Sequence, residues 1–149
     1  MKVTIELDRS CHEERLNMRV WAITDKVNQI RRLAEGRGKF EKVVVEHEGR
    51  SYVIAAEQLT HLVADHGGSL LFVDQRCFVC RDSLKMFEQR FAEDAETPFV
   101  RISKFCIANV DHIDCFEAGF SGNLLLKFKN GRKETVSRRY VNDLKKRLF

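Results

Sequence analysis

Two stretches decide the fold of this chain, Phe99-Val-Arg-Ile-Ser-Lys-Phe-Cys-Ile-Ala-Asn109 and Asn130-Gly-Arg-Lys-Glu-Thr-Val-Ser-Arg-Arg-Tyr140. Each places basic side chains beside short apolar segments, where a β-rich frame would have its turns and helix starts. From residue 99 onward the chain carries 11 Lys and Arg against 5 Asp and Glu, whereas residues 1–98 carry 15 against 17. The positive surplus of the last third therefore favours an anionic partner.

The sequence around these stretches has the pattern of a mainly β protein with short helices. Apolar residues bounded by Gly, Asp and Asn turns predict strands over residues 43–45, 52–54, 59–64, 70–73, 77–80, 99–101, 113–118 and 124–128. Residues 103–108 are expected to form one short helical turn. Helices should begin at Asp82 or Ser83 and after Ser137, which would cap the second one. Asn130 and Gly131 predict a type I′ hairpin turn, because both of its central positions need a positive φ.

The N-terminal residues are expected to form a separate extension of ββα type. Alternation of polar and apolar residues predicts two strands, and Thr24 is a suitable cap for an amphipathic helix. The strands would cover residues 3–7 and 16–20, and the helix residues 25–35. Gly36-Arg-Gly38 is the candidate linker. We therefore expect an extension over residues 1–38 and a second domain over residues 39–149.

Composition also limits the class of protein. The N-terminus lacks the apolar core of a secretory signal, and no run approaches the roughly 20 apolar residues of a membrane span. A cytoplasmic protein is therefore expected. The five cysteines show no paired spacing, so they are expected to be reduced and mostly buried.

Catalytic and metal-binding patterns are weak in this sequence. Cys77-Phe-Val-Cys80 has the spacing of half a zinc site or of a redox pair, but residues three apart on a strand point to opposite faces. The neighbours Cys11 and His12, and His112 with Cys115, lack a loop that could stabilise an oxyanion. We expect no enzyme activity, no cofactor and no metal, and a cysteine- or metal-dependent enzyme is the least favoured alternative.

The basic cluster of Lys104, Arg138 and Arg139 is the best candidate site. Arginine presents a planar fork that can grip guanine, and the amides of a helix start attract phosphate. Cations are disfavoured at that end of a helix, which favours an anionic partner over a merely solvated face. Eight phenylalanines, Phe105 among them, are expected on core faces, whereas Phe120 between glycines is expected to be exposed.

Taken in order over about 50 residues, these motifs resemble the LytTR family of bacterial DNA-binding domains. The family pattern Phe-x-Arg-x-His-Arg/Lys-Ser-x-Ile/Val-Val-Asn is similar to residues 99–109, and 126–131 and 136–141 follow in the family's order. Ser103 stands where the family has His, Phe105 where it has Ser, and Ala108 where it has Val. The extension resembles that of stand-alone members without a receiver domain.

The resemblance implies a fold of small antiparallel sheets in an elongated set, joined by short helices. Loops and helix starts would then enter successive major grooves. The three residues that would read bases are Ser69, Lys104 and Arg139. Those that would bind phosphate or support the readers are Arg101, Ser103, Ser137 and Arg138. Gly67 and Gly68 would allow the loop of Ser69 to approach DNA closely.

The resemblance also implies partners. Family members bind double-stranded DNA, usually at direct repeats and as dimers, so we expect a transcriptional regulator without a small-molecule substrate. Stand-alone members are often held in check by a small membrane protein. The alternative is therefore a protein-interaction module regulated by sequestration, whose DNA binding is weak or lost and whose N-terminal helix pairs with a partner or a second copy.

Overall fold

A computed structural model describes residues 18–34, 42–94 and 97–149 of the chain. The chain divides into two compact units, residues 1–39 and 40–149, and each is described by itself. In the first unit, α1 (Asp25–Ala34) begins after Thr24, whose Oγ1 accepts a hydrogen bond from the Val27 N–H at 3.4 Å. This contact agrees with the expected cap.

Of the two expected N-terminal strands, the one at residues 3–7 lies outside the described residues, and the one at residues 16–20 lies in them only over residues 18–20. Residues 1–17 and the candidate linker at 36–38 lie outside the described residues. Residues 18–20, in which the second strand was expected to end, are irregular. Alternation alone does not make a strand, because the backbone also needs a paired neighbour for its hydrogen bonds.

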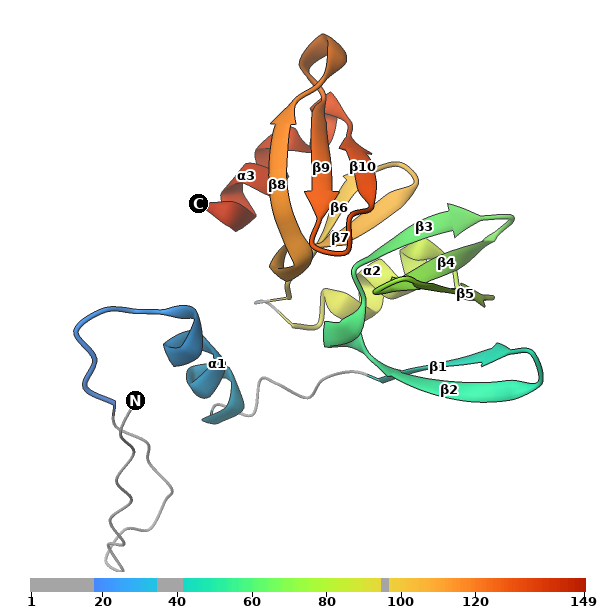
Figure 1. The fold of residues 1–149 in the computed structure, drawn as a ribbon, viewed down its shortest axis with the longest axis horizontal. Helices are drawn as coiled ribbons and strands as arrows, with labels where there is room; N and C mark the ends of the chain where they lie inside the picture. The colour runs from blue at the N-terminus through green and yellow to red at the C-terminus, as the bar shows by residue number, and fades with distance from the viewer. Residues whose placement is uncertain (1–17, 35–41, 95–96) are drawn as a thin grey trace, which may run out of the picture. The chain divides into compact units, whose positions relative to one another are not determined.

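The second unit is built of three antiparallel sheets (Figure 1). The first is a ribbon of β1 (Lys42–His47) and β2 (Arg50–Ala55). The second has the order β5-β4-β3-β7-β6 and contains β3 (His61–Asp65), β4 (Gly68–Val73), β5 (Arg76–Cys80), β6 (Phe99–Ser103) and β7 (Cys106–Asn109). The third has the order β10-β9-β8 and contains β8 (Ile113–Ala118), β9 (Leu124–Phe128) and β10 (Lys133–Val136).

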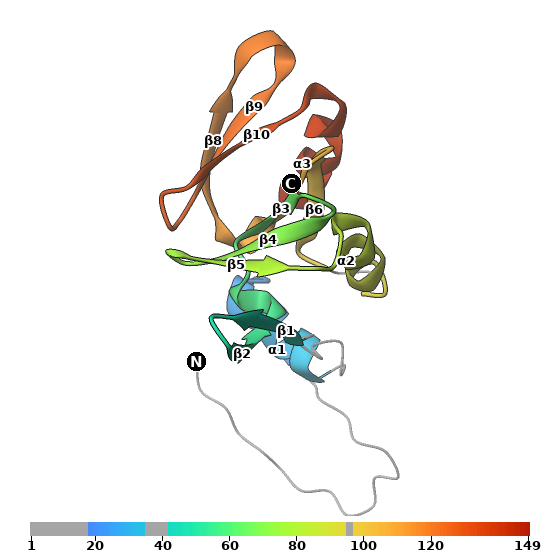
Figure 2. The same cartoon turned by 90° about the vertical axis from the view of Figure 1, so that its right-hand side faces the viewer.

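Short helices connect and cover these sheets. The α-helices are α2 (Leu84–Phe91) and α3 (Val141–Leu148), and the single helical turns are η1 (Ala56–Gln58), η2 (Val110–His112), η3 (Phe120–Gly122) and η4 (Arg138–Tyr140). The side view shows the three sheets in succession (Figure 2). The expected fold class, small antiparallel sheets with short helices, is confirmed. No helix among the described residues is long and apolar enough to cross a membrane.

The segment expected to be a helical turn at 103–108 is instead the second strand of a hairpin. Lys104 and Phe105 form the turn, and β7 follows between β3 and β6. Every residue of β7 is buried, because Ile107 packs into one hydrophobic cluster and Cys106 and Ala108, on the opposite face, pack into another. A strand buried throughout loses the alternation of polar and apolar residues by which strands are recognised.

The turn at Asn130 also differs from the expected type I′ turn. Of its two central residues only Gly131 has a positive φ, of 87°. The Gly131 N–H donates to the Phe128 carbonyl and the Phe128 N–H to the Arg132 carbonyl, which defines a three-residue loop with glycine in the left-handed position. This loop allows Asn130 Nδ2 to donate to the Asp74 carbonyl at 2.8 Å, so it docks onto the β4–β5 turn.

Two hydrophobic clusters hold the unit together. One lies between the ribbon, α2 and the five-stranded sheet, and its fully buried side chains include Leu62, Leu71 and Phe87. The other lies between β6, the three-stranded sheet and α3, around Ile102 and Leu126. β6 contributes to both clusters and so fixes the turn at its end relative to all three sheets.

Candidate nucleic-acid interface

Two backbone hydrogen bonds bring three segments of the second unit together. The Ala64 N–H donates to the Phe105 carbonyl at 2.8 Å and joins the β3–β4 hairpin to the β6–β7 turn. The Ser137 N–H donates to the Ile102 carbonyl at 2.9 Å and joins the start of η4 to β6. We call residues 65–67, 103–105 and 137–139 the loop edge. The tips of the β3–β4 and β6–β7 hairpins point to the same side in Figure 1.

Lys104 is exposed at the tip of the β6–β7 turn. In the part of the chain that the structure describes, its ammonium has no ion-pair partner; Nζ lies 5.7 Å from the centroid of the Phe105 ring. Ser103 Oγ accepts a hydrogen bond from the Phe105 N–H at 3.1 Å, so this hydroxyl holds the turn that presents Lys104. The turn can therefore offer a free cation to an anionic or acceptor-rich ligand.

Phe105 is 60% exposed, so its expected place on a core face is wrong. The residue stands at a turn, where its side chain leaves the sheet instead of lying between sheets. Phe116 is also partly exposed at 38%, because little packs on either face of β8, whose residues after Ile113 are all exposed. Phe120 is 89% exposed in the β8–β9 connection, as expected.

Arg138 and Arg139 are exposed in η4. The Arg139 guanidinium lies 5.7 Å from the centroid of the Tyr140 ring, within the range of a cation–π contact. The expected cap by the Ser137 side chain is not formed; the Arg138 N–H instead donates to Asn123 Oδ1 at 2.9 Å. The acceptor belongs to the connection between β8 and β9, because the chain enters η4 beside residue 123. The local sequence does not reveal this proximity.

Ser69, one of the three expected base readers, is completely buried. Its Oγ donates to the Asp82 carbonyl at 2.7 Å, which ties β4 to the segment before α2. A Cβ on Gly68 would collide with the Cys80 carbonyl oxygen, so that glycine permits the pairing of β4 with β5. The structure therefore does not present Ser69 to a ligand.

The exposed residues of this hairpin are His66 and Gly67, at its tip. Both have positive φ values, 45° and 83°, as a two-residue hairpin loop of type I′ requires. His66 Nδ1 lies 2.8 Å from Asp65 Oδ1, and the His66 side chain is otherwise open to solvent. The sequence feature that could have shown this is the dipeptide His66-Gly67, which suits a two-residue turn. A turn at that position places Ser69 in the strand that follows and not in the loop.

A groove of about 400 Å³ separates this hairpin from the start of α2 and the β6–β7 turn. Its ionisable lining residues are Asp65, His66, Lys85, Arg101 and Lys104. Lys85 and Lys104 are exposed cations. An anionic group entering this groove would be attracted by both of them.

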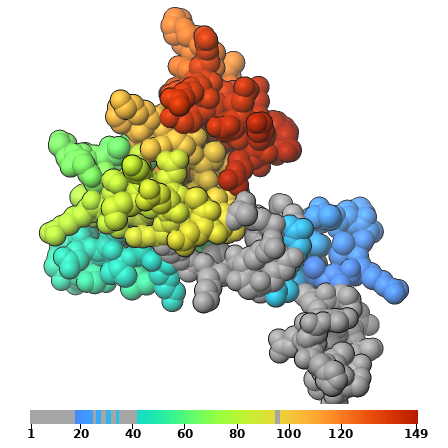
Figure 3. All heavy atoms as spheres, turned by 180° about the vertical axis from the view of Figure 1, so that it is seen from behind, coloured from blue at the N-terminus to red at the C-terminus, as the bar shows by residue number. Residues whose placement is uncertain are grey.

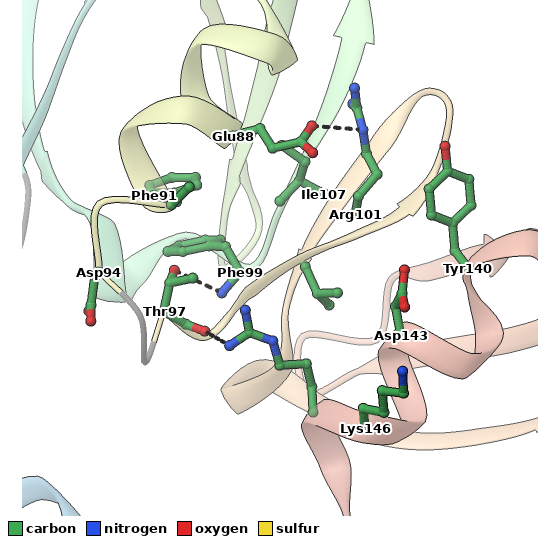
Figure 4. A pocket seen from close by; sticks show the side chains of 13 residues that line it. Glu88, Phe91, Asp94, Thr97, Phe99, Arg101, Ile107, Tyr140, Asp143 and Lys146 are labelled. Atoms are coloured by element: carbon green, nitrogen blue, oxygen red, sulfur yellow. Dashed lines mark hydrogen bonds and ion pairs between the residues drawn. The ribbon is translucent and has the colours of Figure 1, made fainter.

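Arg101 lies behind the groove and is only partly exposed. Its Nε is 3.2 Å from Glu88 Oε2 on α2, and its Nη1 is buried without a hydrogen-bond partner among the described residues. The side chain also borders a cavity of about 520 Å³ between α2 and α3, next to the stacked rings of Phe91 and Phe99 (Figure 4). Figure 3 shows this side, with α3 in red beside the yellow and orange surface of α2 and β6. The geometry suits a supporting role for Arg101.

The cysteines of the described residues differ in exposure. Cys77 and Cys115 are exposed, contrary to the expectation of mostly buried thiols, whereas Cys106 is buried. Burial raises the pKa of the Cys106 thiol far above its usual range and, to a smaller extent, the pKa of Cys77. Among the described residues, no group of three or more His, Cys, Asp or Glu side chains is placed so that it could hold a metal ion. Cys11 and His12 lie outside them.

Comparison with known proteins identifies a matching family and similar proteins. The model of the LytTr DNA-binding domain family matches residues 49–149. The sensory transduction protein LytT of Enterococcus faecalis is 29% identical over 115 residues, which cover 77% of this chain and 46% of that protein. LytT of Bacillus anthracis is 26% identical over 115 residues, with the same coverage of 77% and 46%. The chain spans less than half the length of these relatives.

A solved structure has the same fold. It is a LytTr DNA-binding domain from Bacillus cereus, which superposes with a TM-score of 0.64 at 22% identity and covers 72% of this chain and 95% of that one. The two antiparallel sheets that form the loop edge thus belong to an architecture already seen in a DNA-binding domain.

Proposed function

The chain belongs to the LytTR family of DNA-binding domains, and we propose on that premise that it is a transcriptional regulator that reads a specific sequence of double-stranded DNA. The observation that carries this proposal is the loop edge, where the Ser137–Ile102 hydrogen bond sets the segment of Arg139 beside β6, whose turn carries Lys104. Both side chains are exposed cations on short, fixed segments. Such segments can enter a major groove about 12 Å wide.

Lys104 and Arg139 are the base readers in this proposal. Lysine and arginine donate to guanine O6 and N7, and the planar fork of arginine does so with two hydrogen bonds. The Tyr140 ring beneath the Arg139 guanidinium would orient it without neutralising its charge. His66 takes the place of the buried Ser69 as the residue of the β3–β4 loop that reaches DNA.

The remaining residues of the interface hold phosphate or position the readers. Arg138 and Lys85 are exposed cations, and Ser137 is half-buried at the start of η4, where its hydroxyl is free of a capping bond. Ser103 and Arg101 support the β6–β7 turn through their contacts with the Phe105 N–H and Glu88. The net positive charge of the last third supplies a sequence-independent attraction that weakens with salt.

The proposal is tested with a binding site selected from a random DNA library. Arg139→Ala should weaken binding to the selected site by about 1–3 kcal/mol, the worth of a good bidentate base contact, and should weaken binding to random DNA much less. Lys145→Ala, which removes an exposed charge from α3, serves as the matched control and should affect both DNAs slightly. If Arg139→Ala weakens binding to the selected site and to random DNA equally, Arg139 contacts phosphate and does not read a base. Failure to select any site, or binding indifferent to salt, would contradict the proposal.

Assembly and regulation are part of the same proposal. Two copies would bind direct repeats in the cytoplasm, and a small membrane protein would hold the regulator away from DNA. The first unit is the candidate contact, because Trp21 and Ile23 beside α1 are 97% and 73% exposed. Sedimentation of the protein over a range of concentrations tests self-association. A monomer at all concentrations that also binds the selected site as one copy would contradict a homodimer.

A further inference from the structure

The exposed ring of Phe105 has no role in the fold that the structure describes. Its backbone is held on both sides, since its N–H donates to Ser103 Oγ at 3.1 Å and its carbonyl accepts from the Ala64 N–H at 2.8 Å. The side chain is nevertheless 60% exposed and borders the groove beside Lys85 and Lys104. A large, partly exposed apolar ring therefore stands on a fixed backbone beside two cations, in a groove that Asp65 also lines.

We propose that Phe105 determines sequence specificity by contacting the C5-methyl group of a thymine, next to the guanine that Lys104 contacts. This inference rests on the proposed function, and it names the bases that the β6–β7 turn recognises. The thymine methyl is the apolar group on the major-groove edge of the base pairs, and apolar side chains recognise it by contact.

The geometry of the turn suits two adjacent base pairs. Lys104 Nζ and the Phe105 ring centroid are 5.7 Å apart, and successive base pairs are about 3.4 Å apart along the DNA axis. A cation and a ring at this separation can contact neighbouring bases of one step without rearrangement of the backbone. The turn would thus recognise a guanine–thymine or thymine–guanine step.

Two other exposed aromatic rings of the second unit, Phe149 and Phe120, lack these surroundings. Phe149 ends α3 and is 87% exposed. Phe120 is 89% exposed in the β8–β9 connection, outside the groove lined by Lys85 and Lys104. Exposure alone is common for single apolar residues. The fixed backbone of Phe105 and the cation beside it are what favour recognition.

Replacement of single thymines by deoxyuridine tests the inference, because deoxyuridine lacks only the methyl group. In the selected site, one such replacement beside a guanine should weaken binding of the wild-type protein by about three- to tenfold, as expected for loss of one buried methyl contact. Phe105→Ala should bind the unmodified site more weakly by a similar factor and should be indifferent to that replacement. Phe149→Ala, the matched control, should show the wild-type pattern.

The outcomes separate this inference from the proposed function. If no site can be selected, the proposed function itself fails. If a site is selected but Phe105→Ala responds to every deoxyuridine as the wild type does, the proposed function stands and the methyl contact is rejected. A wild-type protein indifferent to every replacement rejects it as well, whatever the behaviour of the variant. A loss of DNA bending in Phe105→Ala without any deoxyuridine effect would show that the ring wedges between bases, and would also overturn the inference.

Discussion

The ring of His61 in β3 lies parallel to the ring of Phe128 in β9, with centroids 4.7 Å apart and planes inclined by 5°. On its other face His61 stacks on Phe72 at 4.3 Å, and the Arg132 guanidinium covers Phe72 at 4.6 Å. This stack joins the five-stranded sheet to the three-stranded sheet. The relative position of the two sheets, which carry the segments of the loop edge, therefore depends on it.

Removal of the Phe128 ring should destabilise the second unit strongly. Phe128 is completely buried, so Phe128→Ala leaves a cavity, and we expect the free energy of unfolding to fall by about 3–5 kcal/mol. Denaturation by urea, followed by circular dichroism, measures this loss. Phe149→Ala, at an exposed ring, should change the stability by less than about 0.5 kcal/mol. Equal stabilities of the two variants would show that the stack does not hold the sheets.

The cap of η4 should depend on Asn123 and not on Ser137. Asn123→Ala removes the acceptor of the Arg138 N–H and should reduce stability by about 1 kcal/mol, as loss of a helix cap does. Ser137→Ala should cost less, because its hydroxyl makes no capping bond. Thermal unfolding of both variants provides the comparison. A larger loss of stability for Ser137→Ala than for Asn123→Ala would show that Ser137 caps η4, as the local sequence suggested.

Ser69 and His66 should differ in which property they affect. Ser69→Ala removes the buried hydrogen bond to the Asp82 carbonyl and should lower stability by about 1 kcal/mol, with DNA affinity nearly unchanged. His66→Ala should leave stability nearly unchanged, since the side chain is exposed, and should weaken binding to the selected site. Paired measurements of unfolding and binding test this division. Weaker DNA binding by a fully folded Ser69→Ala protein would contradict it.

The thiol of Cys106 should make stability depend on pH in the alkaline range. Burial, and secondarily Glu134, raises the pKa of the folded thiol well above its ordinary value of 9.0. Below pH 9 the thiol is protonated in both states and contributes no pH dependence. Above pH 9 the Cys106 thiol loses its proton in the unfolded chain but keeps it in the folded protein. The free energy of unfolding should therefore fall by up to about 1.4 kcal/mol per pH unit.

Cys106→Ala isolates this contribution from the other groups that titrate. The stability difference between wild type and variant should shrink as the pH rises from 8 to 10, measured by urea denaturation at each pH. A difference that is constant over this range would show that Cys106 ionises as readily in the folded protein as in the unfolded chain.

Much of the fold followed from the sequence because its signals are local. Two-residue turns at Glu48-Gly49 and His66-Gly67 have positive φ at both positions and lie between alternating strands. Ser83 caps α2 by accepting a hydrogen bond from the Met86 N–H, as its position before an apolar stripe suggested. The resemblance to the LytTR family was confirmed, since ordered motifs over the last third are specific. The division of roles between the two units stays a prediction.

The expectations that failed share one physical cause. β7 was not recognised as a strand because a hydrophobic cluster packs on each of its two faces, and burial on both faces removes the period-two pattern. Ser69 was expected at the surface because the sequence does not say which way a residue after a turn points or that Asp82 receives its hydroxyl. In both cases the deciding partner is distant in the chain.

By itself, the sequence determined the β-rich class, the family, the helix caps set by neighbouring residues, and the cations Lys104 and Arg139 as candidate readers. These depend on interactions within a few residues or on side-chain chemistry, which the order of residues specifies directly. The tertiary structure alone decided that Asn123 caps η4, that Ser69 is inside, and that Phe105 is outside beside Lys104. The Asn123 cap and the buried Ser69 hydroxyl depend on hydrogen-bond partners 15 and 13 residues away, which only the packing of the sheets brings within reach. Phe105 is outside because it lies in the β6–β7 turn and not in a buried strand.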